Sequence, residues 1–143
     1  KNHNSVSIYK SETFGKQIDV SQCPDIAPIL GVLGYVSSGV TKIVNAKRLV
    51  MKESNRLLST FKTLETYGVE VKMGEDSLRI VGTKNLHGNV FDSFNDHRIA
   101  MTVAIAATIA DSKVTILNAE AINKSYPTFY QDLEKLGVKI KYY

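Results

Sequence analysis

The chain repeats itself at an interval of about 70 residues, and this internal repeat constrains its fold more than any single segment does. In each half, a mostly apolar segment begins with Ile-Ala, at Ile26 and at Ile99. A strand-like segment follows and ends in Asn-Ala, at Asn45 and at Asn118. A helix-like segment then ends in the pattern Leu-Glu-x-x-Gly-Val in both halves. One structural unit therefore occurs twice.

Hydrophobic periodicity and turn residues predict the elements of each half as strand, helix, strand, helix, strand. Gly68 and Gly137 follow the second helix of each half, where a C-cap favours a residue of positive φ. Helices are expected at residues 25–36, 54–67, 99–110 and 128–136. Strands are expected at residues 5–9, 17–20, 40–45, 69–73, 77–81, 89–92, 114–118 and 138–142.

The four expected helices are of two kinds. Residues 25–36 and 99–110 are apolar on nearly every side, whereas residues 54–67 and 128–136 have one apolar stripe and a charged face. Two helices should therefore be buried and two should lie outside. This pattern predicts an α+β fold built of repeated βαβαββ units with buried helices. The expected organisation is a single partial domain, with units at residues 5–82 and 88–143 inside 1–143 and the second unit incomplete.

Composition excludes several classes of protein. The chain is 43% hydrophobic and 22% charged, and no apolar run approaches the ~20 residues of a membrane span. The net charge of +4 comes from scattered lysines and arginines, and no nucleic-acid-binding motif appears. Cys23 has no partner for a disulfide and is expected to be buried or half-buried. We expect a cytoplasmic protein that binds neither a membrane nor nucleic acid.

A cluster of charges stands at the start of the second apolar helix. Asp96 can cap the first turn, His97 follows it, and Arg98 together with the positive end of the helix dipole can attract an anion. Taken alone, these residues could equally be an ordinary helix cap with incidental charges. The repeat changes this balance, because it places the loops 48–56 and 122–127 at the same end of the domain.

The charges of these loops suit a small substrate with several negative charges. Arginine binds carboxylate or phosphate with two hydrogen bonds, lysine neutralises phosphate, and Asp25 and Glu53 remain for proton transfer. The candidate substrate-binding and catalytic residues are Asp25, Lys52, Glu53, Arg56, Arg98 and Lys124, with Asp96 and His97 in support.

Three segments carry a resemblance to a known family. Lys-Glu-Ser-Asn-Arg-Leu at residues 52–57, Asn-Asp-His-Arg-Ile-Ala-Met at residues 95–101 and Lys-Ser-Tyr-Pro at residues 124–127 resemble the signature segments of 5-enolpyruvylshikimate-3-phosphate (EPSP) synthases. The resemblance implies an enolpyruvyl transferase-like fold, of which this chain would hold about two of the three units of one domain. It also implies that the remaining N-terminal domain is the partner of this chain.

The implied reaction moves the carboxyvinyl group of phosphoenolpyruvate to the 5-hydroxyl of shikimate 3-phosphate and releases phosphate. It belongs to the shikimate pathway of aromatic amino acid biosynthesis, and a glyphosate-like anion is expected to compete with phosphoenolpyruvate. The resemblance implies no metal and no organic cofactor.

The family pattern also implies a role for each matching residue. Asp25 would accept the hydroxyl proton and hold shikimate 3-phosphate with Lys52. Glu53 would exchange a proton with the methylene carbon. Arg56 and Arg98 would clamp the carboxylate of phosphoenolpyruvate. Two further expectations concern the remaining charged groups: Lys124 would meet the phosphate and shuttle a proton, and Asp96 and His97 would support the other groups.

The chain departs from the family at three points. It has Asn55 where the family usually has Asp, and Thr128 where an acidic residue is frequent. It is also much shorter, so a fragment that is inactive alone is expected. Two alternatives stay open: an enolpyruvyl transferase that acts on UDP-N-acetylglucosamine, and a non-catalytic βαβαββ module that binds phosphate or RNA.

Overall fold

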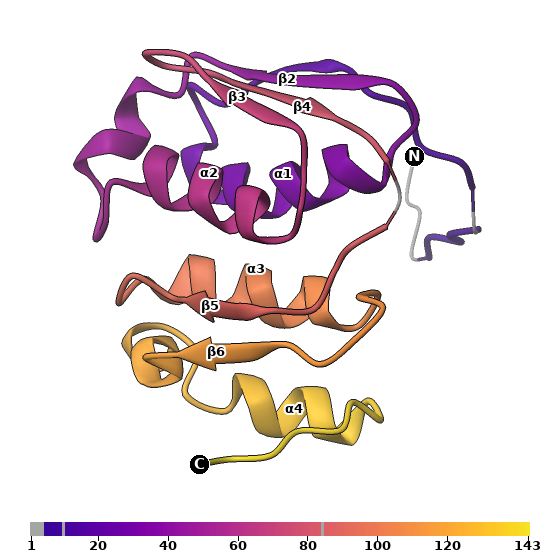
Figure 1. Cartoon of the computed structure of the whole chain (residues 1–143), viewed down its shortest axis with the longest axis vertical. Coiled ribbons are helices and arrows are strands. Elements are labelled where there is room, and N and C mark those ends of the chain that lie inside the picture. Colours follow the sequence, from indigo (N-terminus) through magenta and orange to yellow (C-terminus); the bar gives the residue numbers. More distant parts are fainter. Residues whose placement is uncertain (1–4, 10, 84) are drawn as a thin grey trace.

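The computed structural model describes residues 5–9, 11–83 and 85–143 and mixes helices with short strands (Figure 1). Residues 1–4, 10 and 84, which the expected domain includes, lie outside this description. The helices are α1 (Ala27–Val36), α2 (Arg56–Thr66), α3 (His97–Ala107) and α4 (Phe129–Lys135), with 3-10 helices η1 (Pro24–Ile26), η2 (Lys47–Met51) and η3 (Ala119–Lys124). The strands are β1 (Gln17–Asp19), β2 (Val40–Val44), β3 (Val71–Met73), β4 (Leu78–Val81), β5 (Val90–Asp92) and β6 (Thr115–Leu117).

The strands form two sheets of unequal size. The first half contributes four strands in the order β1-β2-β4-β3, in which β1 and β2 are parallel and the other pairs are antiparallel. The second half contributes the parallel pair β5 and β6. Parallel pairing requires a crossover, and α1 and α3 supply it in the two halves.

The predicted repeat is visible in the backbone. Asn45 and Asn118 follow β2 and β6, and both adopt the left-handed conformation, with φ of 57° and 53°. Each side-chain amide donates a hydrogen bond to the aspartate that ends the neighbouring parallel strand, over 2.7 Å to Asp19 and 3.0 Å to Asp92. The same turn therefore closes the same strand pair in both halves. Gly68 and Gly137 have φ of 82° and 96°, as their C-cap positions predict.

The main core lies between the four-stranded sheet and α3. Figure 1 shows α1 and α2 in the layer between them, with β5 alongside α3 and with β6 and α4 farther from the four-stranded sheet. Tyr35, Ile43, Leu64, Ile80 and Val103 are fully buried there. A smaller cluster packs the other side of α3 against η3 and α4. Both apolar helices therefore lie inside, and the predicted α+β class is confirmed.

The two apolar helices are not buried on every side, contrary to the sequence-based expectation. The side chains of Ile29 and Leu33 on α1 are 37% and 45% exposed, and Ile105 on α3 is 39% exposed. The difference arises because no element of the described residues packs against these positions. Cys23 is also exposed rather than buried, since it precedes η1 at the rim of the molecule.

Two expected strands do not form. Residues 5–9 have no strand partner among the described residues, and Val6, Ile8 and Tyr9 are more than four-fifths exposed. Residues 138–142 follow α4 without pairing, because the described residues include no equivalent of β4 beside them. The remaining strands agree with the prediction to within two residues. No described helix combines the length and apolar character that crossing a bilayer requires.

Candidate active site

Three segments of the chain converge on the carboxylate of Asp25. This residue lies in η1 just before α1, and its side chain caps neither helix. Its Oδ1 contacts Lys52 Nζ at 3.1 Å and Arg56 Nη1 at 2.8 Å, and its Oδ2 lies 3.7 Å from Arg98 Nη2. Because Asp25 caps nothing, both oxygens are available to these cations.

The cations around Asp25 change its acidity. The hydrogen bond from Lys52 is the main reason that the pKa of Asp25 lies below its ordinary value. Burial is the next-largest effect and opposes it, and the charges of Lys52, Arg56 and Arg98 lower the pKa further. Asp25 is therefore ionised at neutral pH.

Arg56 is buried, and carboxylates surround it. Only 2% of its side chain is exposed. Its Nε and Nη2 donate to the two oxygens of Asp96 at 2.9 and 3.1 Å, and its Nη1 donates to Asp25. Glu53 Oε2 lies 3.8 Å from Nη2. The structure thus places Arg56 inside an ion-pair network, whereas the sequence pointed to an open anion clamp.

Asp96 caps α3 in addition to pairing with Arg56. Its Oδ1 accepts a hydrogen bond from the backbone N–H of Arg98 at 2.9 Å, so it caps α3 as predicted. It is completely buried, and burial alone raises the pKa of its carboxyl group. The hydrogen bonds and charge of Arg56, with those from Arg98 N and Ser54, outweigh burial and leave the pKa below its ordinary value.

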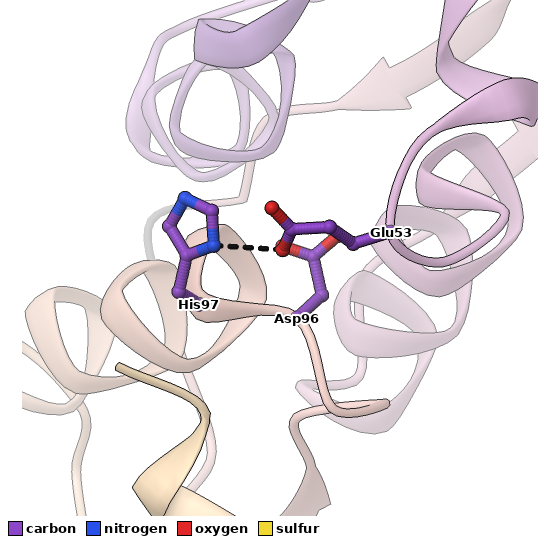
Figure 2. A group of neighbouring side chains, drawn as sticks. All are labelled: Glu53, Asp96 and His97. Atoms are coloured by element: carbon purple, nitrogen blue, oxygen red, sulfur yellow. Dashed lines mark hydrogen bonds and ion pairs between the residues drawn. The ribbon is translucent and has the colours of Figure 1, made fainter. Parts of the chain in front are cut away.

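Glu53 and His97 form a second carboxylate contact beside Asp96, as Figure 2 shows. His97 Nδ1 lies 2.7 Å from Glu53 Oε2, and His97 is buried while Glu53 is partly exposed. Potential ligand atoms of Glu53, Asp96 and His97 lie within 4.8 Å of one another. Arg56 already occupies the same carboxylate oxygens, so this donor set fits a neutralised charge network better than a metal site.

Lys124 reaches the same surface from η3. Its Nζ donates to the backbone carbonyl of Asn95 at 2.5 Å, just before Asp96. Asn95 and the preceding Phe94 both adopt the left-handed conformation, with φ of 53° and 54°. That conformation is costly for a bulky residue such as Phe94, and local strain of this kind is typical of functional loops. Asparagine tolerates this conformation, but nothing in the residue type of Phe94 indicates it.

At the entry of α2, Asn55 is the N-cap, and its Oδ1 accepts a hydrogen bond from Leu58 N at 3.1 Å. The hydroxyl of the preceding Ser54 donates to Asp96 Oδ2 at 3.0 Å. The departure from the usual Asp at position 55 therefore keeps a capping function here. Thr128 precedes α4 without capping it, because its hydroxyl donates to Asp132.

Three cations remain partly open at this surface. Lys52 and Arg98 are partly exposed, and Lys124 is exposed. The Nε of Arg98 is buried and has no hydrogen-bond partner in the described part of the chain. A buried donor without a partner is costly, so a ligand oxygen at this position would be favoured. The site therefore combines anion-binding cations with the ionised carboxylate of Asp25.

Comparison with known proteins gives one consistent family. The sequence profile of the family EPSP synthase (3-phosphoshikimate 1-carboxyvinyltransferase) matches residues 1–133. A 3-phosphoshikimate 1-carboxyvinyltransferase of Clostridium novyi is 52% identical over 132 residues, which are 92% of this chain and 30% of the relative. The chain thus spans about a third of the length of this relative.

Solved structures agree with the fold. An EPSP synthase from Acinetobacter baumannii superposes with a TM-score of 0.81 at 26% identity, over 87% of this chain and 30% of that one. The enolpyruvyl transferase NikO from Streptomyces tendae gives a TM-score of 0.77 at 23% identity, over 92% of this chain and 30% of that one. The second likeness concerns the fold alone.

Proposed function

The chain belongs to the EPSP synthase family, and on this premise we propose that it supplies part of the active site of a 3-phosphoshikimate 1-carboxyvinyltransferase. The substrates would be phosphoenolpyruvate and shikimate 3-phosphate, and the products would be the enolpyruvyl ether and phosphate. Residues 5–82 and 88–143 would be two repeat units of one domain. The rest of the enzyme would supply the opposing side of the site, so we expect no turnover by this chain alone.

The observation that carries this proposal is the convergence on Asp25 of Lys52 and Arg56, from the entry of α2, and of Arg98, from α3. A structural ion pair needs one cation. Three cations around one carboxylate, two of them partly open to solvent, suit a site in which substrate anions replace some of these contacts.

Such a replacement would also activate Asp25. With Lys52 and Arg56 on its Oδ1, the lowered pKa makes Asp25 a weak base. If the carboxylate of phosphoenolpyruvate takes over Arg56 Nη1, and shikimate 3-phosphate takes over Lys52, Asp25 loses the contacts that lower its pKa. Its basicity then rises at the moment when the 5-hydroxyl must lose a proton.

Glu53 would deliver the proton to the methylene carbon of phosphoenolpyruvate. His97 holds its Oε2, while Oε1 accepts no hydrogen bond from the described residues and the side chain is 38% exposed. One oxygen is therefore fixed and the other can face a substrate. His97 would position this carboxylate without touching the substrate itself.

Arg98 and Lys124 would hold the negative charges of phosphoenolpyruvate. The unpartnered Nε of Arg98 would bind its carboxylate, and Lys124 would meet its phosphate. Asn95 fixes the starting position of Lys124 through its carbonyl group. The transfer of the carboxyvinyl group and the release of phosphate require proton movements and the binding of anions, which these residue types provide.

A chimera tests the proposal. The segment of the Clostridium novyi relative that matches this chain is replaced by residues 1–133, and phosphate release from phosphoenolpyruvate is measured with shikimate 3-phosphate present. We expect release that depends on the shikimate phosphate and that fails with UDP-N-acetylglucosamine as acceptor. A folded chimera that releases no phosphate with either acceptor would refute the proposal, and release with UDP-N-acetylglucosamine alone would favour the alternative transferase.

A further inference from the structure

The segment that joins η2 to α2 has no backbone hydrogen bond of its own. Residues 52–54 follow Met51, where η2 ends, and precede Asn55, the N-cap of α2. Among the described residues, no N–H or C=O group of these three residues pairs with another backbone group. Such a segment keeps its position only through its side chains. It nevertheless carries Lys52 and Glu53, which would act on the substrates.

Three side chains hold this segment in place. Lys52 does so through its ion pair at 3.1 Å, and Glu53 through its contact with His97 at 2.7 Å. Ser54 donates its hydroxyl proton to Asp96 Oδ2 over 3.0 Å. Lys52 and Glu53 would engage the substrates, so their surroundings change during the reaction. Ser54 is assigned no substrate, and its hydrogen bond can therefore persist throughout.

Asp96 is a fixed point for this hydrogen bond. Its side chain is completely buried, and Arg56 donates to both of its oxygens. The backbone N–H of Arg98 donates to Oδ1 and joins the carboxylate to the first turn of α3. Ser54 therefore ties residues 52–54 to the start of α3, and Figure 2 shows Glu53 beside this helix start.

The hydroxyl protons give the contact of Ser54 a direction. An ionised carboxylate can only accept a hydrogen bond, so the single proton of Ser54 points to Asp96. Ser59 Oγ lies 2.9 Å from Ser54 Oγ and must then be the donor in that pair. Its proton can instead reach the carbonyl of Asn55 at 3.0 Å. Ser59 thus supports Ser54 from the buried face of α2, whereas the link to α3 is made by Ser54 itself.

We propose that Ser54 is a positioning residue for the carboxyvinyl transfer, because it anchors residues 52–54 to α3 while the substrates react. This role rests on the proposed function, in which Glu53 gives a proton to the methylene carbon. In that step the O–H bond of Glu53 breaks, and a C–H bond forms from the double-bond electrons of phosphoenolpyruvate. The adjacent carbon receives the 5-hydroxyl oxygen, and Asp25 receives the hydroxyl proton.

The anchor acts on Glu53 through a single peptide unit. Consecutive Cα atoms are about 3.8 Å apart, so fixing Ser54 limits how far the Glu53 carboxyl group can move from the methylene carbon. A displacement of about 1 Å can lower a rate by about a hundredfold. Loss of the Ser54 hydroxyl should therefore slow the proton step more than it weakens the binding of phosphoenolpyruvate.

Backbone order in the intact chain tests the anchor without any substrate. In Ser54→Ala, the NMR order parameter of the Glu53 amide should fall from near the rigid value of about 0.85 toward about 0.6. Ser54→Thr keeps a hydroxyl and should keep the order. Ser37→Ala is the matched control, because it removes a buried serine hydroxyl with two contacts at the end of α1 opposite to Asp25. Unchanged order at Glu53 in Ser54→Ala would overturn the proposal.

The Clostridium novyi chimera tests the role in the reaction, at saturating shikimate 3-phosphate. Ser54→Ala should lower kcat by about tenfold or more. The KM for phosphoenolpyruvate should change by less than about twofold, because Arg98 and Lys124 bind it from other segments. The solvent deuterium isotope effect on kcat should rise, since proton delivery becomes slower. Ser54→Thr should restore kcat, and Ser37→Ala should match the unaltered chimera.

Two kinetic outcomes would contradict a positioning role. One is a loss in Ser54→Ala that is confined to the KM for phosphoenolpyruvate, and the other is an isotope effect equal to that of the unaltered chimera. A chimera that releases no phosphate before any change at position 54 would refute the proposed function, whereas the order parameters still decide whether Ser54 anchors the segment.

Ser59→Ala separates the anchor from its support. This variant leaves the hydrogen bond between Ser54 and Asp96, so it should lower both kcat and the order at Glu53 less than Ser54→Ala does. A larger loss in Ser59→Ala would assign the anchor to the buried hydroxyl of Ser59 and would contradict the role of Ser54.

Discussion

Arg56 and Asp96 are both withdrawn from solvent, and each satisfies the other with two hydrogen bonds. Removing one partner of such a pair leaves an uncompensated charge inside the protein. Arg56→Met should therefore lower the free energy of unfolding by about 3–5 kcal/mol in denaturant titrations. Lys62→Met removes an exposed cation from the same helix and should change it by less than about 0.5 kcal/mol.

A double variant separates the lost charge from lost packing. Asp96→Asn in the Arg56→Met background removes the stranded carboxylate, so the double variant should be less destabilised than Arg56→Met alone. If Arg56→Met resembles Lys62→Met, the buried network does not stabilise the fold as we describe.

The pH dependence of stability follows from the lowered pKa of Asp96. Its folded pKa lies below the ordinary 3.8, so the unfolded chain binds the proton more readily. Its stabilising effect is therefore complete above about pH 5 and is lost as the pH falls through the folded pKa. The free energy of unfolding between roughly pH 5 and 2 should fall less steeply in Asp96→Asn than in the unaltered chain. Equal slopes would assign acid sensitivity to the other aspartates, such as Asp132 with a pKa of about 2.

The sequence indicated which residues lie at the site better than it indicated which of them contact one another. The sequence identified Asp25, Lys52 and Arg98 as neighbours, and they lie together. It could not show that Arg56 is buried among carboxylates, because long charged side chains are usually exposed and the partners come from other segments. It also missed the contact of Lys124 with Asn95, because a backbone carbonyl leaves no mark in the sequence.

At the scale of elements, the equivalent turns after β2 and β6 should respond alike to substitution. Asn118→Gly loses the hydrogen bond to Asp92 but keeps the left-handed backbone, whereas Asn118→Ala loses both. The stability order should be Asn, Gly, Ala, with a total loss of about 1–2 kcal/mol for Ala in denaturant titrations. The same order is expected at Asn45. An alanine variant as stable as the glycine variant would show that the turn conformation carries no cost.

The pattern of elements was largely predictable because the repeat supplied each helix and strand twice. Apolar periodicity located α1, α2, α3 and α4, and glycine located two helix ends. The strands expected at residues 5–9 and 138–142 failed for a common reason. A strand needs a partner, and a β pattern in the sequence does not reveal whether a partner strand is present.

At the scale of the whole molecule, the exposed apolar side chains of α1 and α3 should cause self-association. Leu33 and Ile105 are 45% and 39% exposed on helices that are otherwise apolar. Sedimentation velocity should show association that grows with concentration and that weakens in Leu33→Lys combined with Ile105→Lys. Leu136→Lys is the control, because it also replaces an exposed leucine by lysine but lies at the C-cap of α4 rather than on α1 or α3. It should weaken association less than the double variant does. A monomer at all concentrations would contradict this expectation.

The fold class followed from the sequence, and the inside position of two apolar helices was confirmed by their place in the core. What did not follow was how completely they are covered. An all-round apolar pattern indicates that a helix can be buried on each side, but the coverage depends on which other elements are present. The exposed faces of α1 and α3 are thus apolar surface that no other element of the described residues covers.

The most direct test of the central claim compares Arg98→Ala with Lys62→Ala in the active Clostridium novyi chimera. Both variants remove one cation, but only Arg98 lies beside Asp25. The account predicts that Arg98→Ala lowers kcat/KM for phosphoenolpyruvate by about a hundredfold or more while Lys62→Ala leaves it unchanged. Equal values for the two variants would contradict the claim that the cations around Asp25 bind the substrate.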